Sequence, residues 1–313
     1  MTAMQAVVAR DRAAGISGLE VAEMPYPHAA ENDVIVQVHA ASFTPGELDW
    51  PGTWTDRSGR DRTPAIPGHE ASGVVAGLGY GTTGLTVGQR VFGLTDWARN
   101  GTLAEYVAVE ARNLAPLSGS VDHVVAAALP ISGLTALQGL FDHAHLVTGQ
   151  TVLIHGAAGA VGSLAVQLAH EAGAHVIGTG RAEHRETVLG LGANDFLDLQ
   201  GDRLEDVGKV HVVFDVVGGE ILDRSAALVR SDGVLVTIAE PPRVRPDDGR
   251  AVFFVVEPDR SGLIALERRL REDRLRPIVG TVCPLAQAPS AFDPANRTAG
   301  KTIVRVVPDG GDR

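Results

Sequence analysis

Three glycines follow a short apolar stretch near the middle of the chain. Residues 152–154 read Val-Leu-Ile, Gly156, Gly159 and Gly162 come next, and a stretch with helical periodicity follows them. A strand, a glycine turn and a helix in this order let backbone N–H groups and a helix N-terminus meet a pyrophosphate. The fingerprint is a variant, because Ala157 stands at its first glycine position, but its context predicts a dinucleotide-binding turn. The residues expected to line this turn are Gly156, Ala158, Gly159, Ala160, Val161 and Gly162.

The residues after the second predicted strand, 175–178, bear on the choice between NADH and NADPH. No carboxylate stands at the strand end, where NAD-selective proteins accept the ribose 2′-OH. Two arginines follow within about one helical turn, and a guanidinium pairs with a phosphate through two hydrogen bonds. We therefore expect NADPH, with the alternative that the arginines only begin a solvated helix beside two glutamates. The residues expected at this end of the cofactor are Thr179, Gly180, Arg181 and Arg185.

Composition excludes several classes of partner. The 313 residues are 44% hydrophobic, which is enough for two domains with cores. The formal net charge of −11 argues against nucleic acid. No apolar stretch approaches the roughly 20 residues that span a bilayer, and residues 1–10 do not resemble a signal peptide. A single cysteine, Cys283, excludes an internal disulfide, so we expect a cytoplasmic protein.

The pattern of predicted strands and helices changes twice along the chain. The first third is rich in short alternating stretches separated by glycine turns, which predicts a compact barrel-like β domain. Strands and helices then alternate, which predicts a parallel sheet of crossover units. Strands are expected at 34–40, 72–76, 89–93 and 103–109, then at 152–154, 175–178, 195–197, 211–215, 234–238 and 252–256, with 301–307 as a closing strand. We therefore predict one domain formed by residues 1–122 and 279–313, interrupted by a second at 123–278.

Several motifs together resemble a known family. They are Gly68-His69-Glu70 with its following strand, 88–93, 101–106, 134–136, the turn at 157–162, 214–219 and 299–301. In this order and spacing they resemble the medium-chain dehydrogenase/reductase superfamily, and its zinc-free quinone oxidoreductase branch in particular. The resemblance implies an α/β protein in which a GroES-like β-rich substrate domain is interrupted by a Rossmann domain. It also implies an active site between the two domains that binds NADPH and a small electrophilic substrate.

Zinc-dependent members of this superfamily hold the metal at positions that look to be Thr44, His69 and Ile131 here. Only His69 could bind zinc among them, and a catalytic site needs about three protein ligands, so we predict no metal. His69 then acts either as a hydrogen-bonded histidine that holds a turn or as a proton donor. A hybrid metal site of His69, Asp49 and Glu70 is the remaining alternative.

Without a Lewis acid, the accessible chemistry is hydride transfer to an activated carbon, either a quinone ring or the β-carbon of an enone. The resemblance brings Thr44 and the residues beside it toward the nicotinamide. Two tryptophans precede Gly68, and they either wall a flat pocket or staple an irregular loop. The residues expected to line the substrate pocket are Phe43, Asp49, Trp50, Trp54 and Phe254.

The resemblance also completes the cofactor site and suggests an assembly. It adds Thr135, Val217, Ile238, Phe254, Val256 and Lys301, the last either a third positive charge for the phosphate or a surface lysine. The stretch 253–256 should present backbone groups to the carboxamide and form the sheet edge of a homodimer. Two other functions stay open. One is an enoyl reductase for carrier or CoA thioesters, and the other is a non-catalytic NADPH-binding sensor.

Overall fold

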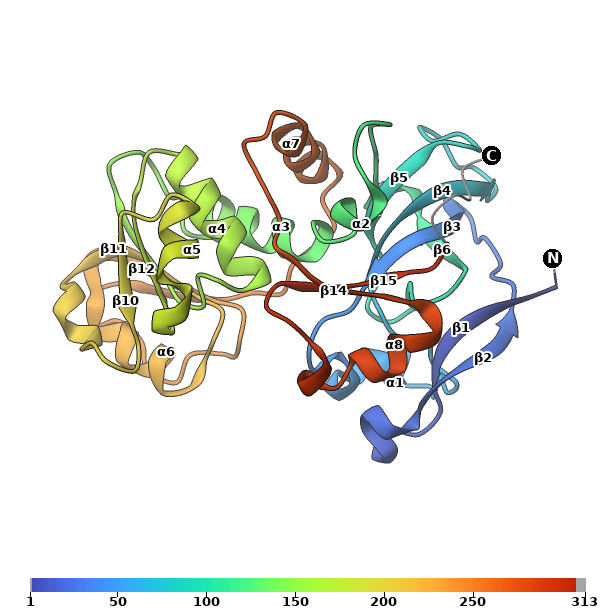
Figure 1. The fold of residues 1–313 in the computed structure, drawn as a ribbon, viewed down its shortest axis with the longest axis horizontal. Coiled ribbons are helices and arrows are strands. Elements are labelled where there is room, and N and C mark those ends of the chain that lie inside the picture. The colour runs from blue at the N-terminus through green and yellow to red at the C-terminus, as the bar shows by residue number, and fades with distance from the viewer. Residues whose placement is uncertain (1, 308–313) are drawn as a thin grey trace. The chain divides into compact units, whose positions relative to one another are not determined.

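The computed structural model describes residues 2–307, so residue 1 and residues 308–313 at the ends of the first predicted domain lie outside it. The chain divides into two compact units (Figure 1). Unit 1 comprises Met1–Ile131, Pro258–Arg271 and Val279–Arg313, and unit 2 comprises Ser132–Glu257 and Glu272–Ile278. Among the described residues, none of the helices combines the length and the apolar character that crossing a membrane requires.

Unit 1 is built from β strands. A hairpin of β1 (Ala3–Ala9) and β2 (Leu19–Pro25) precedes a sheet in the order β14-β15-β3-β4-β5-β7, with β6 also paired to β3. The sheet strands are β3 (Asp33–Ser42), β4 (Glu70–Leu78), β5 (Arg90–Leu94), β6 (Tyr106–Glu110), β7 (Leu114–Pro116), β14 (Val279–Pro284) and β15 (Lys301–Arg305). Its helices are α1 (Pro51–Trp54), α2 (His123–Ala126), α7 (Arg260–Arg271) and α8 (Ala288–Ala291). The helix α3 (Pro130–Leu137) contains the boundary between the units.

Unit 2 is a doubly wound parallel sheet with the order β10-β9-β8-β11-β12-β13. Its strands are β8 (Thr151–Ile154), β9 (His175–Gly180), β10 (Asp195–Asp198), β11 (Val210–Asp215), β12 (Val229–Thr237) and β13 (Arg250–Phe253). Its helices are α4 (Ala160–Glu171), α5 (Arg185–Gly190) and α6 (Gly219–Ser225). Chain order reverses between β8 and β11, and ligands of such sheets bind at this reversal, beyond the carboxyl ends of the strands.

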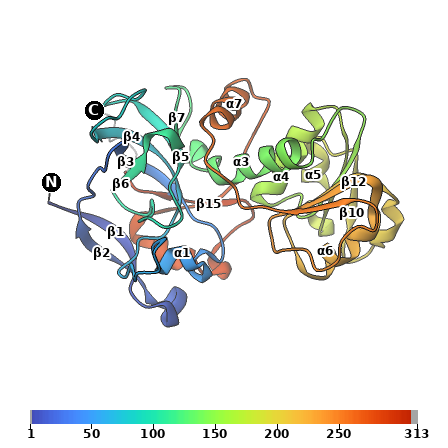
Figure 2. The same cartoon turned by 180° about the vertical axis from the view of Figure 1, so that it is seen from behind.

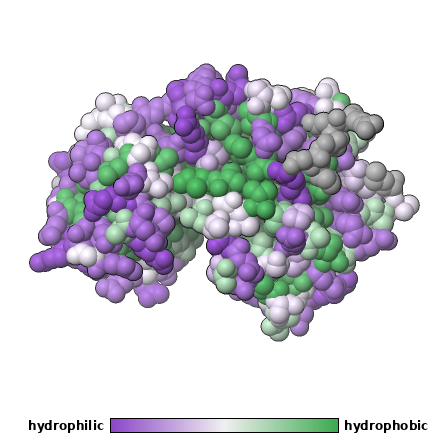
Figure 3. Space-filling view, in the orientation of Figure 1, coloured by the Kyte–Doolittle hydropathy of each residue, from purple (hydrophilic) through white to green (hydrophobic). Residues whose placement is uncertain are grey.

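Burial follows from the apolar pattern. In β8, Val152, Leu153 and Ile154 are fully buried, as expected for a central parallel strand covered on both faces. The helices α4 and α5 lie side by side along the sheet in both views (Figures 1 and 2). On the face of unit 2 that is visible in Figure 3, hydrophilic residues predominate.

The predicted fold class is confirmed. All of the predicted strands have somewhat different limits in the structure, and three of them begin or end two or more residues inside the predicted range. The strand at 103–109 begins only at Tyr106, because Leu103 instead accepts a hydrogen bond from the Val7 amide of β1 at 2.8 Å. The strand at 252–256 is β13 and ends at Phe253, and the closing strand ends at Arg305. The strands β1, β2, β7 and β14 were not predicted.

The short second segment of unit 2 is held by side chains as well as by chain connection. Leu275 is fully buried. Gln167 on α4 donates from Nε2 to the Arg276 carbonyl at 3.0 Å and accepts from the Arg276 amide at 2.9 Å. The segment 272–278 is therefore an integral part of unit 2, although it lies 15 residues beyond Glu257 in the chain.

Candidate active site

The glycine turn of unit 2 takes a shape that only glycine accommodates. Gly156 has φ +65°, and a Cβ there would lie 2.8 Å from a methyl carbon of Val216. A Cβ on Gly162 would overlap the Gly156 carbonyl oxygen. Glycine at these two positions therefore lets α4 begin directly against the end of β8.

The N-terminus of α4 is open to an anion. Its N-cap residue is Gly159, which has no side chain to accept hydrogen bonds from the first helical amides. The first amides of a helix have no partner within the helix, and the helix dipole adds positive potential there. Ala160 and Val161 of this first turn are half-buried. The turn therefore has the free donors that a pyrophosphate requires.

A buried carboxylate fixes the neighbouring turn, which follows β11. Asp215 accepts hydrogen bonds from the amide of Val217 at 3.2 Å and of Gly218 at 3.1 Å, and from the Thr237 hydroxyl at 2.8 Å. Val217 is 53% exposed at the tip of this turn. Ile238 is half-buried, and its amide donates to the Asp215 carbonyl at 3.2 Å. The network holds both predicted cofactor contacts, Val217 and Ile238, at the carboxyl edge of the sheet.

A buried histidine lies beneath the glycine turn. His155 contacts the Thr179 hydroxyl through Nδ1 at 2.9 Å and the Ser225 hydroxyl through Nε2 at 2.7 Å. Complete burial lowers the pKa of His155 to about 4, against the opposing effect of the Asp215 charge. The Thr179 side chain therefore faces the interior, and its carbonyl accepts from the Ala157 amide at 3.0 Å. Sequence reasoning had placed Thr179 at the cofactor and had missed His155.

The two predicted phosphate ligands follow β9, which ends at Gly180. Arg181 is 72% exposed in its side chain, and its guanidinium lies 3.8 Å from Glu183. Arg185 lies with its guanidinium carbon 5.1 Å above the Phe196 ring and 3.8 Å from Asp202. Both guanidiniums are thus exposed and only loosely paired at this end of the strand.

The segment after β13 is clamped by a side chain that sequence reasoning missed. Gln138 donates from Nε2 to the Glu257 carbonyl at 2.8 Å and accepts from the Glu257 amide at 3.1 Å. Gln138 begins a π-helical stretch, Gln138–His143, which continues α3, and such stretches occur often at functional sites. Phe254, with its ring 4.3 Å from His143, is buried between β13 and this clamp. Val256 is buried as well, as is the predicted nicotinamide contact Thr135 on α3.

A second polar centre lies within unit 1, around His69. The ring is 1% exposed, and both of its nitrogens lack a hydrogen-bond partner among the described residues. Its nearest carboxylate oxygen is Glu47 Oε2, 3.6 Å from Nδ1. Glu47 is fixed by the amides of Gly68, at 2.6 Å, and Thr44, at 3.2 Å. His69 is therefore not the hydrogen-bonded turn histidine that was expected. A buried imidazole without hydrogen-bond partners costs free energy.

Two indole rings lie beside this imidazole, and the Thr95 amide donates to the His69 carbonyl at 2.8 Å. The Trp97 ring lies 5.1 Å and the Trp50 ring 6.2 Å from the His69 ring, and the two indoles meet edge to face. The hydroxyls of Thr44 and Thr95 are also buried without a partner in the part of the chain that is described. We call His69, Glu47, Thr44, Thr95, Trp50 and Trp97 the His69 cluster. Sequence reasoning had named His69, Thr44 and Trp50, and it had missed the other three.

Glu70, next to His69, belongs to a separate and fully bonded network. It pairs with Lys301 and accepts hydrogen bonds from the Ser42 hydroxyl at 2.6 Å and the Ile131 amide at 2.8 Å. Lys301 is only 6% exposed. The prediction that Lys301 adds a third charge for a phosphate, or is a surface lysine, was therefore wrong. Its ammonium neutralises a buried carboxylate within unit 1.

Three predicted pocket residues do not join the His69 cluster. Phe43 is 2% exposed and stacks on Phe292 at 3.9 Å. Trp54 is 5% exposed and donates from its indole nitrogen to the Leu48 carbonyl at 2.6 Å. The structure thus places both in the core, where Trp54 staples the loop, while Asp49 is exposed.

Comparison with known proteins bears on both units. Residues 30–119 match the family model of the alcohol dehydrogenase GroES-like domain, and residues 160–255 match that of the zinc-binding dehydrogenases. The chain is 30% identical over 303 residues to the chloroplastic NADPH-dependent alkenal/one oxidoreductase of Arabidopsis thaliana, covering 90% of this chain and 74% of that protein. It is 34% identical over 269 residues to the spectinabilin polyketide synthase system protein NorB of Streptomyces orinoci, covering 77% of this chain but only 12% of NorB.

Solved structures agree with the sequence matches. The structure of the quinone oxidoreductase from Coxiella burnetii superposes on this chain with a TM-score of 0.88 at 25% sequence identity. The superposition covers 97% of this chain and 100% of that chain. The order of strands in unit 2 and the GroES-like unit 1 are the architecture that the resemblance implied. The chain therefore belongs to the medium-chain dehydrogenase/reductase superfamily, as a quinone oxidoreductase-like oxidoreductase.

Proposed function

We propose that the protein is a zinc-independent, NADPH-dependent reductase that transfers hydride to a quinone or to the C=C bond of an activated enone. The observation that carries the proposal is the His69 cluster, a buried box with unused hydrogen-bond donors and too few metal ligands. The alkenal/one oxidoreductase and the quinone oxidoreductase among the similar proteins support this substrate class.

The zinc-binding dehydrogenase match raises the question whether these residues fit zinc. A catalytic zinc ion takes three protein ligands and keeps one open position. Thr44 and Ile131, which the resemblance aligns with ligand positions, offer no thiolate, and Glu70 is held by Lys301. Within residues 2–307, the structure brings together no three His, Cys, Asp or Glu side chains able to hold an ion. The donor set does not fit a zinc ion, and the proposed mechanism uses none.

The residues of unit 2 do fit a nicotinamide dinucleotide. The open amides at the start of α4 suit the pyrophosphate, and the lack of a carboxylate after β9 favours a 2′-phosphate. Arg181 and Arg185 would bind that phosphate, since both guanidiniums are exposed and form no close pair. NADPH, when bound, supplies the hydride.

The His69 cluster would handle the charge that hydride addition creates. As the hydride adds to the β-carbon of an enone, the C=C electron pair moves onto the carbonyl oxygen. The imidazole N–H of His69 would donate a hydrogen bond to that oxygen as it gains charge, and a single solvent proton added to the α-carbon would complete the ketone. Glu47 Oε2, 3.6 Å from Nδ1, would hold the ring in its orientation. Trp50 and Trp97 would exclude water from the reacting oxygen.

The proposal is tested by NADPH and NADH oxidation with 9,10-phenanthrenequinone and with 2-cyclohexen-1-one. We expect turnover with a preference for NADPH, and no loss after extensive treatment with EDTA. Replacing Arg181 and Arg185 by alanine should raise the KM for NADPH about tenfold through lost charge-assisted bonds, with little change for NADH. Equal weakening of both cofactors would refute the 2′-phosphate assignment, and stoichiometric zinc on elemental analysis would refute the metal-free mechanism.

A second candidate function is reduction of an enoyl thioester carried by a biosynthetic assembly. The match to NorB, a polyketide synthase system protein, favours it. Crotonyl-N-acetylcysteamine, a small thioester, separates the two functions. A kcat/KM at least tenfold above that for 2-cyclohexen-1-one would favour the thioester reductase, and binding of NADPH without turnover of any acceptor would favour a sensor.

We also propose a cytoplasmic homodimer that pairs along β13. This strand is an edge of the sheet in unit 2. Phe253 and Val255 are 40% and 59% exposed beside it, and an exposed apolar edge invites pairing. Light scattering should give twice the chain mass, and Val255→Lys should give a monomer. A wild-type chain that remains monomeric at micromolar concentration would overturn the proposal.

A further inference from the structure

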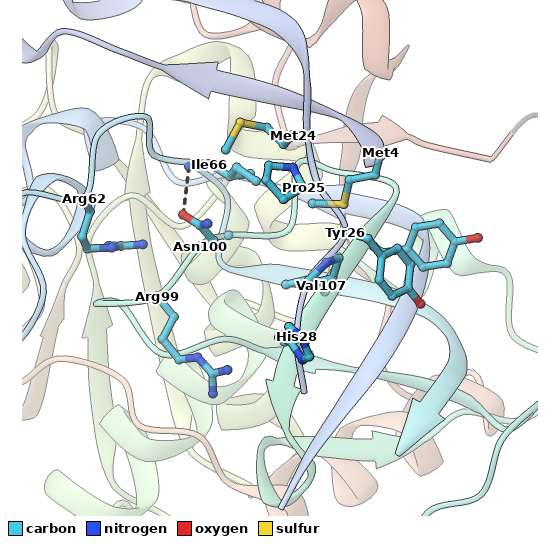
Figure 4. Close-up of a pocket in the computed structure, with 14 residues that line it drawn as sticks. Met4, Met24, Pro25, Tyr26, His28, Arg62, Ile66, Arg99, Asn100 and Val107 are labelled. Carbon is cyan, nitrogen blue, oxygen red and sulfur yellow. Dashed lines mark hydrogen bonds between the residues drawn. The ribbon is translucent and has the colours of Figure 1, made fainter. Parts of the chain in front are cut away.

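A cavity of about 460 Å³ lies within unit 1, apart from the His69 cluster. Figure 4 shows Met4 and Met24 of the β1–β2 hairpin on one side and Arg62, Arg99 and Asn100 on the other. The volume falls in the range of small-molecule pockets. We call it the hairpin pocket.

The wall opposite the arginines is apolar and aromatic. The Tyr26 and Tyr106 rings lie 4.9 Å apart, tilted by 53°. Burial raises the pKa of both phenols, so both are neutral at ordinary pH. Met24 and Ile66 extend this apolar surface. Such a wall suits the hydrocarbon body of a ligand.

Charge in the lining has one sign. Its ionisable side chains are Arg62, Arg99, His28 and the two tyrosines, with no carboxylate among the described lining residues. Arg99 is already neutralised, because it binds Asp33 at 2.6 and 3.0 Å. Burial opposes ionisation of Asp33, but these bonds outweigh it and lower the pKa of Asp33. Arg62 is therefore the cation whose charge is least balanced in this wall.

One nitrogen of the Arg62 guanidinium has no acceptor among the described residues. Its Nη1 donates to the Gly52 carbonyl, while its Nη2 is buried with no partner in the described chain. Burial lowers the pKa of Arg62, and the charges of Asp96 and Asp56 only partly offset that effect. A buried donor on a cation costs free energy when it stays unpaired. A small rotation of the guanidinium toward an anion in the pocket would remove this cost.

We propose that the hairpin pocket binds a small organic carboxylate with an apolar body. The carboxylate pairs with Arg62 beside Asn100, and the body packs between Met24 and the tyrosine pair. One guanidinium edge matches the two oxygens of a carboxylate. A phosphate monoester carries close to two charges and would call for more than one unbalanced cation.

Contacts within unit 1 connect this pocket to the His69 cluster. Arg62 binds the carbonyl of Gly52 in α1, and a Cβ on Gly52 would lie 2.8 Å from the Trp97 carbonyl oxygen. On the adjoining wall, the Ile66 carbonyl accepts a hydrogen bond from the Gly101 amide at 2.7 Å, and Ile66 precedes His69 by three residues. A ligand that binds Arg62 and moves its guanidinium would therefore also shift Gly52 and the loop that contains Trp97. We expect it to change kcat, a consequence that rests on the proposed function, whereas the binding does not.

Titration calorimetry without any nucleotide tests the binding, with 3-phenylpropionate as the probe and the isosteric alcohol 3-phenylpropan-1-ol as its neutral match. We expect saturable 1:1 binding of the acid and at least tenfold weaker binding of the alcohol. Arg62→Gln should weaken the acid at least tenfold, whereas Arg60→Gln, at an exposed site on the same loop, should not. Equal binding of acid and alcohol, or unchanged binding to the Arg62 variant, would overturn the site.

A second pair of variants guards against misfolding of the Arg62 variant. Met24→Trp fills the pocket from the hairpin side and keeps Arg62, so it should abolish binding, while Met24→Leu keeps the volume and should not. Wild-type affinity in the Met24→Trp variant would place the acid elsewhere and refute the proposal. If the acid binds but leaves quinone turnover unchanged, the coupling to the His69 cluster is refuted. Absence of turnover in every sample would instead refute the proposed function and leave the binding result intact.

Discussion

Acidification should loosen unit 2 through His155. Burial holds the pKa of this side chain at about 4, against 6.5 in an unfolded chain. As the pH falls, the unfolded chain therefore binds the proton first, and stability is lost between pH 6.5 and pH 4. A difference of about 2.5 pKa units corresponds to about 3 kcal/mol in full. Between pH 7.5 and pH 5.0 the same two values give a loss of about 2 kcal/mol, or about 30-fold in the opening equilibrium.

Hydrogen exchange followed by mass spectrometry measures this loss unit by unit. Tryptophan fluorescence does not, because Trp50, Trp54 and Trp97 all belong to unit 1. After correction for the intrinsic exchange rate, protection of the β8 and β9 amides should fall about 30-fold from pH 7.5 to pH 5.0. The variant His155→Gln keeps polar atoms for both hydroxyls but cannot take up a proton, so its decrease should be much smaller.

His175 supplies the matched control. It lies in the same unit, but its ring is exposed and pairs with Asp195 at 2.8 Å. The variant His175→Gln should therefore retain the decrease in protection at acid pH. If His155→Gln loses protection as steeply as the wild type does, burial of His155 does not govern the acid response, and the reasoning fails.

Three further predictions concern packing and hydrogen bonding. Gly162→Val should destabilise unit 2 by about 3 kcal/mol, since its side chain overlaps the Gly156 carbonyl; an unchanged thermal midpoint would contradict the tight turn. Gln138→Leu should cost about 2 kcal/mol in urea unfolding through its two lost bonds to Glu257, and a cost near zero would show that water replaces the clamp. Trp54→Phe should cost about 1 kcal/mol by losing its indole hydrogen bond, and no change would mean that this bond does not fix the loop.

The sequence predicted those parts of the fold that depend on residues close together in the chain. The glycine turn and the central strands of unit 2 were predicted because an apolar run, glycines and a helical period occur within a single stretch of chain. The β1 strand was missed, and part of its pairing goes to Leu103, nearly 100 residues away, which no local pattern reveals. The same applies to Lys301, whose charge is cancelled by Glu70 across 231 positions.

The candidate site was predicted in part for the same reason. His69 was identified by its motif, but its lack of partners depends on where Glu47 is fixed by two amides from separate parts of the chain. Phe43 and Trp54 have the composition of a pocket wall, and only the tertiary packing shows them in the core.

The two-part composition of unit 2 has a consequence for biosynthesis and engineering. Its second segment, 272–278, supplies the buried Leu275 and the Arg276 backbone that Gln167 clamps. When the ribosome has added residue 257, unit 2 is therefore still incomplete. Residues 258–278 must also be translated before the segment 272–278 can join it. A fragment cut at 132 and 257 would lack that piece. To express unit 2 alone, the gene should encode residues 132–257 joined directly to residues 272–278.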